Sequence, residues 1–245
     1  MIKNVIIVIF IFSLSANIIG QEKIINRTNQ QWIQYYNQTK FSKHWLLLAD
    51  GGVRWKDKLS ARSQYIIRFG VGYQLNDNIR VAVGIAHLGF YQSGQIKKVE
   101  FRPYQEFSIK QVFGKIGISH RFRIEERYFR KVLNGKITTE DQFNFRFRYS
   151  FSLSIPLFSI TDLKVSLNVG DEIFINAGKE IVYNVFDQNR LLVGSTIQLN
   201  KNLNVDLIYN GQFAGTNSPA KYEYSDIIWF RIIHRINFIK KERIN

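Results

Sequence analysis

The stretch that decides the fold is Asp141–Ile155, DQFNFRFRYSFSLSI. From Phe143 onward its odd positions are aromatic or aliphatic, and its even positions are Asn, Arg or Ser. Side chains of a β-strand alternate between two faces. Strands of soluble sheets usually extend for about 5–6 residues, whereas a strand that crosses a bilayer needs about 9–11. The stretch therefore predicts a transmembrane β-barrel strand, with its aromatic face toward lipid and its cationic face toward the lumen.

The same alternation recurs along the chain. In Arg62–Gln74, the residues Tyr65 to Tyr73 alternate in this way, with Ile66 as the one apolar residue on the polar face. Eleven segments follow the pattern, the first two less cleanly: Gln31–Thr39, His44–Trp55, Arg62–Gln74, Ile79–Tyr91, Phe101–Val112, Ile116–Phe129, Gln142–Ile155, Leu163–Ile175, Leu191–Leu199, Leu203–Phe213 and Ile227–Ile239. Bacterial single-chain barrels normally have an even number of strands. We therefore expect ten strands, if the first segment is not in the wall, or twelve, if residues 21–30 hide another.

The predicted connections alternate in length. Short ones fall at 76–78, 113–115, 156–161 and 200–202, and long ones at 92–98, 130–141, 176–186 and 214–225. Short periplasmic turns and longer outer loops are typical of outer-membrane barrels. The fold class expected is therefore all-β, an antiparallel up-and-down transmembrane β-barrel of about 10–12 strands.

The N-terminus has the three parts of a secretory signal. Lys3 is followed by the apolar run Val5–Leu14 and by the small and polar residues Ser15–Gly20. This order predicts a signal peptide over residues 1–20, and a single barrel domain over 21–245. Cleavage at Ala16 and an uncleaved anchor helix are the alternatives. The predicted location is the bacterial outer membrane, with the signal peptide removed.

The charge balance is strongly basic, with 34 Lys and Arg against 19 Asp and Glu. With a signal peptide, this balance favours outer-membrane lipid, both phospholipid and glycolipid, over nucleic acid as the partner. An anionic solute is a further candidate, and charge that serves only solubility is the alternative. The chain has no cysteine, which excludes disulfides and thiolate zinc sites. No metal or cofactor motif is present, and the oligomeric state is not predicted.

Charged residues concentrate on one face of three neighbouring strands. Alternation and the turn near Gly114 bring Glu106 opposite or diagonal to Arg123 or Glu125. The predicted lumen charge ladder consists of Arg102, Glu106, Arg121, Arg123, Glu125, Arg127, Arg146 and Arg148. Such a ladder either fills and pins a narrow barrel or binds anions through guanidinium forks.

Aromatic residues near strand ends are expected to form interface girdles: Trp32, Trp45, Trp55, Tyr91, Tyr128 and Trp229. Histidines give little support to catalysis. Ser119 and His120 are adjacent in a strand and point to opposite faces, and only His87 has a serine, Ser93, in a nearby loop. No catalytic residues are therefore predicted.

The runs RPYQEF (102–107) and GISHRFRIEERYF (117–129) resemble a bacterial family known as domain of unknown function 2490. The resemblance covers most of the mature chain and implies a secreted, outer-membrane β-barrel, without any activity. The expected role is structural or that of a narrow, Arg-lined pore. A lipid-modifying outer-membrane enzyme and a periplasmic β-barrel carrier are the alternatives.

Overall fold

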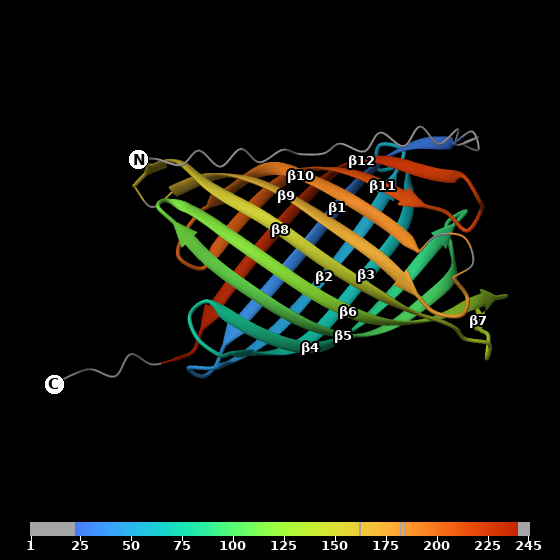
Figure 1. Cartoon of the computed structure of the whole chain (residues 1–245), viewed down its shortest axis with the longest axis horizontal. Helices are drawn as coiled ribbons and strands as arrows, with labels where there is room; N and C mark the ends of the chain where they lie inside the picture. The colour runs from blue at the N-terminus through green and yellow to red at the C-terminus, as the bar shows by residue number, and fades with distance from the viewer. Residues whose placement is uncertain (1–22, 162, 182, 184, 240–245) are drawn as a thin grey trace, which may run out of the picture.

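In the computed structural model, eleven long strands close into a barrel (Figure 1). The structure describes residues 23–161, 163–181, 183 and 185–239, so the predicted signal peptide lies outside it. No helix among these residues is long and apolar enough to cross a membrane. The strands are β1 (Ile24–Lys40), β2 (Trp45–Lys56), β3 (Ala61–Gln74), β4 (Ile79–Gln92), β5 (Gln95–Phe113), β6 (Ile116–Leu133), β8 (Gln142–Ile160), β9 (Leu163–Ala177), β10 (Phe186–Gln198), β11 (Leu203–Gly215) and β12 (Lys221–Asn237); the short β7 (Lys136–Ile137) pairs only with the end of β6.

A parallel seam closes the barrel. Strands adjacent in the wall pair antiparallel, except that β1 lies parallel to β12, from Ile24 opposite Lys221 to Lys40 opposite Asn237. In an antiparallel meander of eleven strands, the first and last run in the same direction, so they can only pair in parallel. The expectation of ten or twelve strands and of a fully antiparallel wall was therefore wrong, because the even-number rule does not apply to a parallel closure.

Several connections are shorter than expected. The predicted loop at 92–98 is a two-residue turn, Ser93-Gly94, and both residues have positive φ, 49° and 77°. The predicted turn after Pro156 is also wrong, because β8 continues to Ile160 with a register shift between Pro156 and Phe158. A proline cannot donate to a ladder, and a bulge is where a strand tolerates it. The contrast between long and short loops is correspondingly weaker than predicted.

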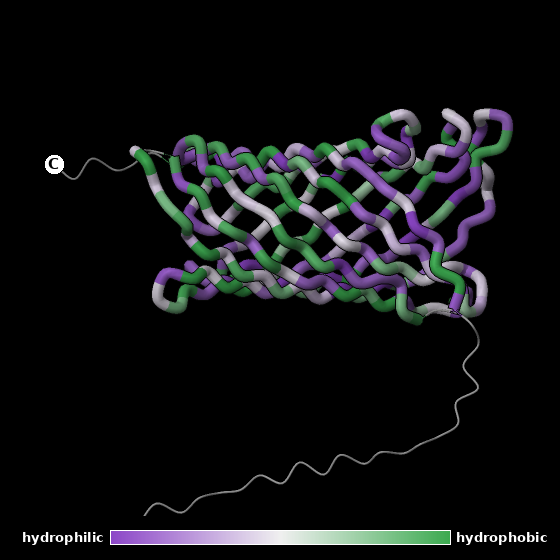
Figure 2. The backbone as a smooth tube through the Cα atoms, turned by 90° about the horizontal axis from the view of Figure 1, so that it is seen from above, coloured by the Kyte–Doolittle hydropathy of each residue, from purple (hydrophilic) through white to green (hydrophobic). Residues whose placement is uncertain are grey.

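The two faces of the wall have opposite character. Apolar and polar residues alternate along the strands in Figure 2. Large apolar side chains are exposed on the outer face, as with Phe69 at 56% and Val83 at 59%, while buried positions include many Arg, Glu, Gln and Asn. A water-soluble domain has the reverse arrangement.

Two small apolar clusters lie among the inward side chains. One consists of Trp32, Ile208, Ile227 and Trp229, and the other of Ile66, Ala86 and Leu88. The expectation that Trp32 and Trp229 belong to an outer girdle was therefore wrong. Trp32 points into the barrel on the same face of β1 as Gln34, and Trp229 is a buried position of β12. Their rings meet edge to face, 5.2 Å between centroids.

The outer face carries cross-strand pairs of tyrosine and histidine. Tyr hydroxyls and His Nδ1 atoms lie 3.0–3.1 Å apart in Tyr35–His234, Tyr65–His87 and His120–Tyr149. Trp45, Tyr91 and Tyr128 also contact other outer aromatic rings. Rings with a polar tip suit a boundary between apolar and aqueous surroundings.

Candidate lumen site

A cavity of about 770 Å³ occupies the barrel interior. At one end its lining includes Asp57 of the β2–β3 loop and Ser93 of the β4–β5 turn. At the other it includes Gln38 and Arg235, each two residues before its strand ends. The cavity therefore extends along nearly the whole lumen.

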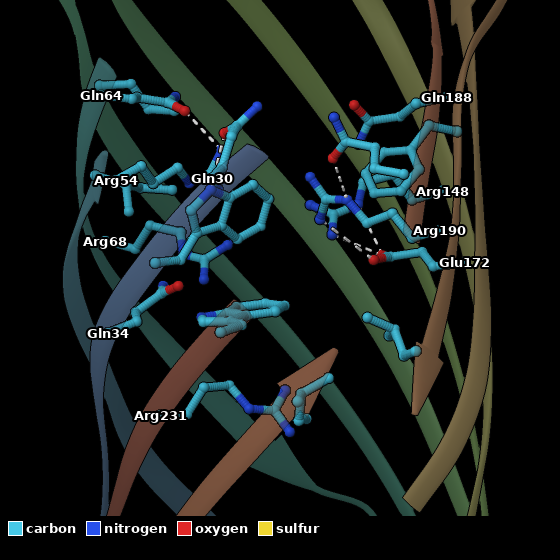
Figure 3. Close-up of a pocket in the computed structure, with 18 of the residues that line it drawn as sticks. Gln30, Gln34, Arg54, Gln64, Arg68, Arg148, Glu172, Gln188, Arg190 and Arg231 are labelled. Atoms are coloured by element: carbon cyan, nitrogen blue, oxygen red, sulfur yellow. Dashed lines mark hydrogen bonds and ion pairs between the residues drawn. The ribbon is translucent and has the colours of Figure 1, made fainter. Parts of the chain in front are cut away.

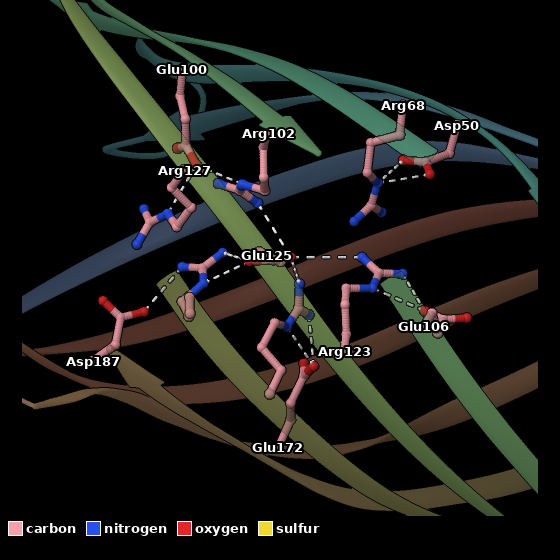
Figure 4. A network of polar contacts seen from close by, with 12 residues as sticks. Asp50, Arg68, Glu100, Arg102, Glu106, Arg123, Glu125, Arg127, Glu172 and Asp187 are labelled. Carbon is pink, nitrogen blue, oxygen red and sulfur yellow. Dashed lines mark hydrogen bonds and ion pairs between the residues drawn. The ribbon is translucent and has the colours of Figure 1, made fainter. Parts of the chain in front are cut away.

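A network of ion pairs covers one side of the lumen, on β5, β6, β8 and β9, and we call this side the paired wall (Figure 4). At its centre Glu125 has no exposed surface. Its carboxylate lies 2.5 Å from Arg146 and 2.6 Å from Arg148, and also reaches Arg102 and Arg123 at 3.6 and 3.8 Å. One carboxylate thus contacts four guanidinium groups from three strands.

Glu106 forms the second centre of the paired wall. It lies directly opposite Arg123 in the β5–β6 ladder, and the two side chains form a buried ion pair. Arg80 approaches the same carboxylate to 3.3 Å and Arg121 to 4.0 Å. The tight turn between β5 and β6 sets this register.

Three further carboxylates join this wall that the sequence had not indicated as site residues. Glu100 accepts from Arg102 and Arg127 at 2.6 and 2.9 Å. Glu172 on β9 lies 2.6 Å from both Arg121 and Arg148, and Asp187 lies 3.0 Å from Arg146. Glu100 could have been predicted, because it lies two residues before Arg102 and therefore on the same face of the strand. All eight residues of the predicted ladder are in this network.

Aromatic rings separate the guanidinium groups of the paired wall. Phe174, fully buried, has Arg146 and Arg148 of this wall, and Arg190 of the neighbouring strand β10, over its ring at 4.4–5.2 Å from the centroid. Cations gain from contact with a ring face, most strongly where water is excluded. These contacts let several like charges share a small volume.

The opposite side of the lumen, which we call the open wall, carries cations with fewer carboxylates. It consists of Trp32 on β1, Arg54 on β2, Gln64 on β3, Arg190 on β10 and Gln212 on β11. Arg54 donates to Gln64 at 2.6 Å and lies 3.8 Å from the centre of the Trp32 ring. Among the described residues, no carboxylate forms an ion pair with Arg54.

Arg190 is only loosely paired. It donates to the Gln212 carbonyl oxygen at 2.9 Å and lies 5.1 Å from the Trp32 ring centre. Its nearest carboxylate is Glu172, at 3.7 Å. In Figure 3, Arg54 and Gln64 project from one side of the pocket and Arg190 from the other.

Two other arginines that line the cavity are each paired with an acid. Arg68 pairs with Asp50 at 2.8 Å, and Arg231 pairs with Asp206 at 2.6 Å. Arg54 differs from these two arginines, and among the described residues Arg235, near the end of β12, is another cavity cation without an ion pair.

We next consider candidate metal ligands and catalytic histidines in the described part of the chain. No group of three or more His, Asp or Glu side chains gathers there in a way that would hold a metal ion. His87, which the sequence placed near Ser93, bonds to Tyr65 on the outer face. His44 bonds to the backbone carbonyl of Gln74 at 2.8 Å.

Comparison with family models gives one match. The model described as "Protein of unknown function (DUF2490)" matches residues 29–223, which include every strand of the barrel at least in part. Neither the comparison with curated proteins nor that with solved structures gave a match.

Proposed function

We propose that this chain, which belongs to the DUF2490 family, is a bacterial outer-membrane β-barrel whose lumen forms a narrow, anion-preferring passage. The observation that carries the proposal is the cavity, which reaches from Asp57 to Arg235 and is lined by many more guanidinium groups than carboxylates. Rings of charge along a pore bias the ions that pass. Excess positive charge in a confined lumen favours anions.

The outer face supports a membrane environment. Its apolar side chains remain exposed around the barrel, and a soluble protein rarely leaves contiguous apolar area so extensive uncovered. In a closed barrel every backbone group of the wall can pair within the sheet, which is the condition for strands in hydrocarbon. Outer-membrane phospholipid and glycolipid are the partners proposed for this face, with the basic charge of the chain directed to their phosphates.

The division of the lumen supports a passage that is lined and narrowed by fixed charges. The arginines of the paired wall are neutralised by carboxylates of the same wall. This wall therefore narrows and stiffens the lumen more than it attracts solutes. The open wall leaves Arg54 without an acid beside it. The sign of the selectivity therefore comes mainly from the open wall.

Planar-bilayer recording tests this function. The chain is purified from membranes, incorporated into a bilayer, and recorded under a KCl gradient. We expect small single-channel steps and a reversal potential that shows preference for Cl⁻ over K⁺. Cation preference, or a protein that inserts without conducting, would overturn the passage.

Location needs a separate measurement. Membrane fractionation, combined with heat-modifiable migration on a gel, distinguishes an outer-membrane barrel from a soluble carrier. We expect the chain in the outer-membrane fraction, with folded and heated forms that migrate differently. Recovery in the soluble periplasmic fraction without detergent would refute the proposed location.

A further inference from the structure

We infer that the open wall is a binding site for a small oxyanion, a solute that bears a carboxylate or phosphate group, held between Arg54 and Arg190. The inference rests on the proposed function, because it names the solute class that the passage selects. Binding can nevertheless be measured without conductance. Four features of the site support it: an unpaired guanidinium, amide donors turned to the cavity, a fixed aromatic ring, and enclosure.

Arg54 supplies the first feature. One terminal nitrogen donates to Gln64, so its Nε and the other terminal nitrogen keep their donors. Both Arg54 and Arg190 line the cavity. Enclosed guanidinium groups normally have an acid beside them, as every Arg of the paired wall has. A bound anion would supply the missing counter-charge.

Gln64 and Gln212 supply the second feature. The carbonyl oxygen of Gln64 accepts from Arg54, and that of Gln212 accepts from Arg190. Each amide therefore has its NH₂ group left for the cavity that both residues line. The site consequently offers donors from two guanidinium groups and two amides, with their nearby oxygen acceptors already engaged.

Trp32 supplies the third feature. Its indole N–H donates to the side-chain oxygen of Gln30 at 3.0 Å, which fixes the ring plane. Arg54 lies 3.8 Å above this ring, and Arg190 reaches the same ring from β10. The ring is therefore a contact that the two guanidinium groups share. Planar forks match the paired oxygens of carboxylate and phosphate better than they match a spherical halide.

Enclosure limits the size of the ligand. The cavity volume of about 770 Å³ is shared along the whole barrel, so only part of it lies between the two arginines. Inorganic phosphate and succinate are suitable probes, because they carry the two oxyanion types on small frames. A difference between them would identify which of the two the site recognises.

Isothermal titration calorimetry of the purified protein in detergent tests the site. Phosphate and succinate are titrated separately at constant ionic strength, with chloride as the reference anion. We expect saturable binding of at least one oxyanion, and affinity at least 10-fold lower in Arg54→Gln and Arg190→Gln. Arg54→Lys, which keeps the charge but loses the fork, should fall between wild type and Arg54→Gln.

Arg235→Gln is the matched control. It removes the same charge from the same cavity, near the end of β12 and away from Trp32. We expect wild-type affinity in this variant, and heat-modifiable migration verifies that each variant is folded. Should a variant fail to fold, Gln64→Leu tests the same donor set without removing a charge.

The outcomes separate the site from the passage. Absence of saturable binding to either probe in the wild type overturns the site, as does an equal loss in Arg235→Gln and Arg54→Gln. Oxyanion binding without conductance overturns the passage and leaves the site standing. Anion conductance without binding does the opposite.

Discussion

The paired wall and the open wall face the same lumen and use the same cation, yet they differ in what surrounds it. On the paired wall, Glu125 alone contacts four guanidinium groups. On the open wall, Arg54 contacts an amide and an indole ring. The difference teaches that charge in this barrel serves two purposes. Where acids are present the arginines link neighbouring strands, and where an acid is missing we propose that the arginines bind a solute.

This division gives the two walls opposite responses to mutation. Removing one partner of a buried ion pair leaves an uncompensated charge, which costs much more than the pair contributed. Removing a cation that has no acid beside it leaves no opposite charge uncompensated. The same kind of substitution should therefore damage stability on one wall and selectivity on the other.

The largest expected effect comes from Glu125→Gln. Four guanidinium groups would then share no central carboxylate, and we expect the free energy of unfolding to fall by about 3–5 kcal/mol. Urea unfolding in detergent, followed by tryptophan fluorescence, measures it. The matched control is Glu126→Gln, one residue along on the outer face, where the side chain accepts only from Gln105. Equal midpoints for the two variants would contradict the role given to the paired wall.

A second effect tests the close packing between Gly84 of β4 and Tyr104 of the paired wall. A Cβ at Gly84 would clash with the Phe69 carbonyl oxygen and would lie 2.5 Å from the Tyr104 hydroxyl, and the Tyr104 ring contacts Arg123. We expect Gly84→Ala to lower the free energy of unfolding by about 1–3 kcal/mol.

Gly117→Ala serves as the control for this substitution. Its added Cβ would meet Ser154 at 3.6 Å, an ordinary contact. The same urea measurement should show no loss for this variant. A loss as large as that of Gly84→Ala would show that glycine itself, and not the space under Tyr104, is what matters.

A third and smaller effect on stability is expected at the open wall. Arg54→Gln removes a cation that faces Arg190, so the free energy of unfolding should change by less than about 0.5 kcal/mol or rise. The same variant should lose anion preference in the bilayer. A destabilisation comparable to that of Glu125→Gln would eliminate the distinction between the walls.

The smallest effect is expected outside the lumen, at the pair of Arg130 and Asp141. The hydrogen bond and charge of Arg130 hold the pKa of Asp141 below its usual value. The pair therefore adds stability above the unfolded-state pKa of Asp141, and this is lost as the pH falls through the lowered, folded-state pKa.

Because both side chains of this pair are solvent-exposed, screening leaves that contribution small. Asp141→Asn and the wild type should unfold at nearly the same urea concentration at pH 7, and the small difference between their midpoints should disappear toward acidic pH. A separation of the two curves at neutral pH would show that this exposed pair contributes as the buried ones do.

Much of the paired wall was predictable because it depends on local order. Parity within a strand placed Arg146 and Arg148 on one face. The turn near Gly114 placed Glu106 opposite or diagonal to Arg123 or Glu125, and in the structure it lies opposite Arg123. Both properties depend on residues close together in the sequence. The eleven segments with alternating polarity were likewise visible, although the final count was set aside on the even-number rule.

The open wall was not predictable in the same way. Trp32 was expected in an interface girdle because of its residue type and its place near a strand end, whereas its parity places it inside. Arg54 and Arg190 approach one ring only because β1, β12 and β11 bring β2 and β10 to the same part of the lumen. That neighbourhood depends on the closure of the barrel, which alternation within single strands does not encode.

The parallel seam has a consequence for access to the chain in the membrane location that we propose. Ile24 and Lys221 begin their strands at the same rim, so Ile24 and Asn237 lie at opposite rims. In a barrel of even strand number the two would share a rim. An epitope inserted just before Ile24 and another placed after Asn237 should therefore be reached by antibody or protease from different compartments. A circular permutation would need a linker that spans the full height of the wall.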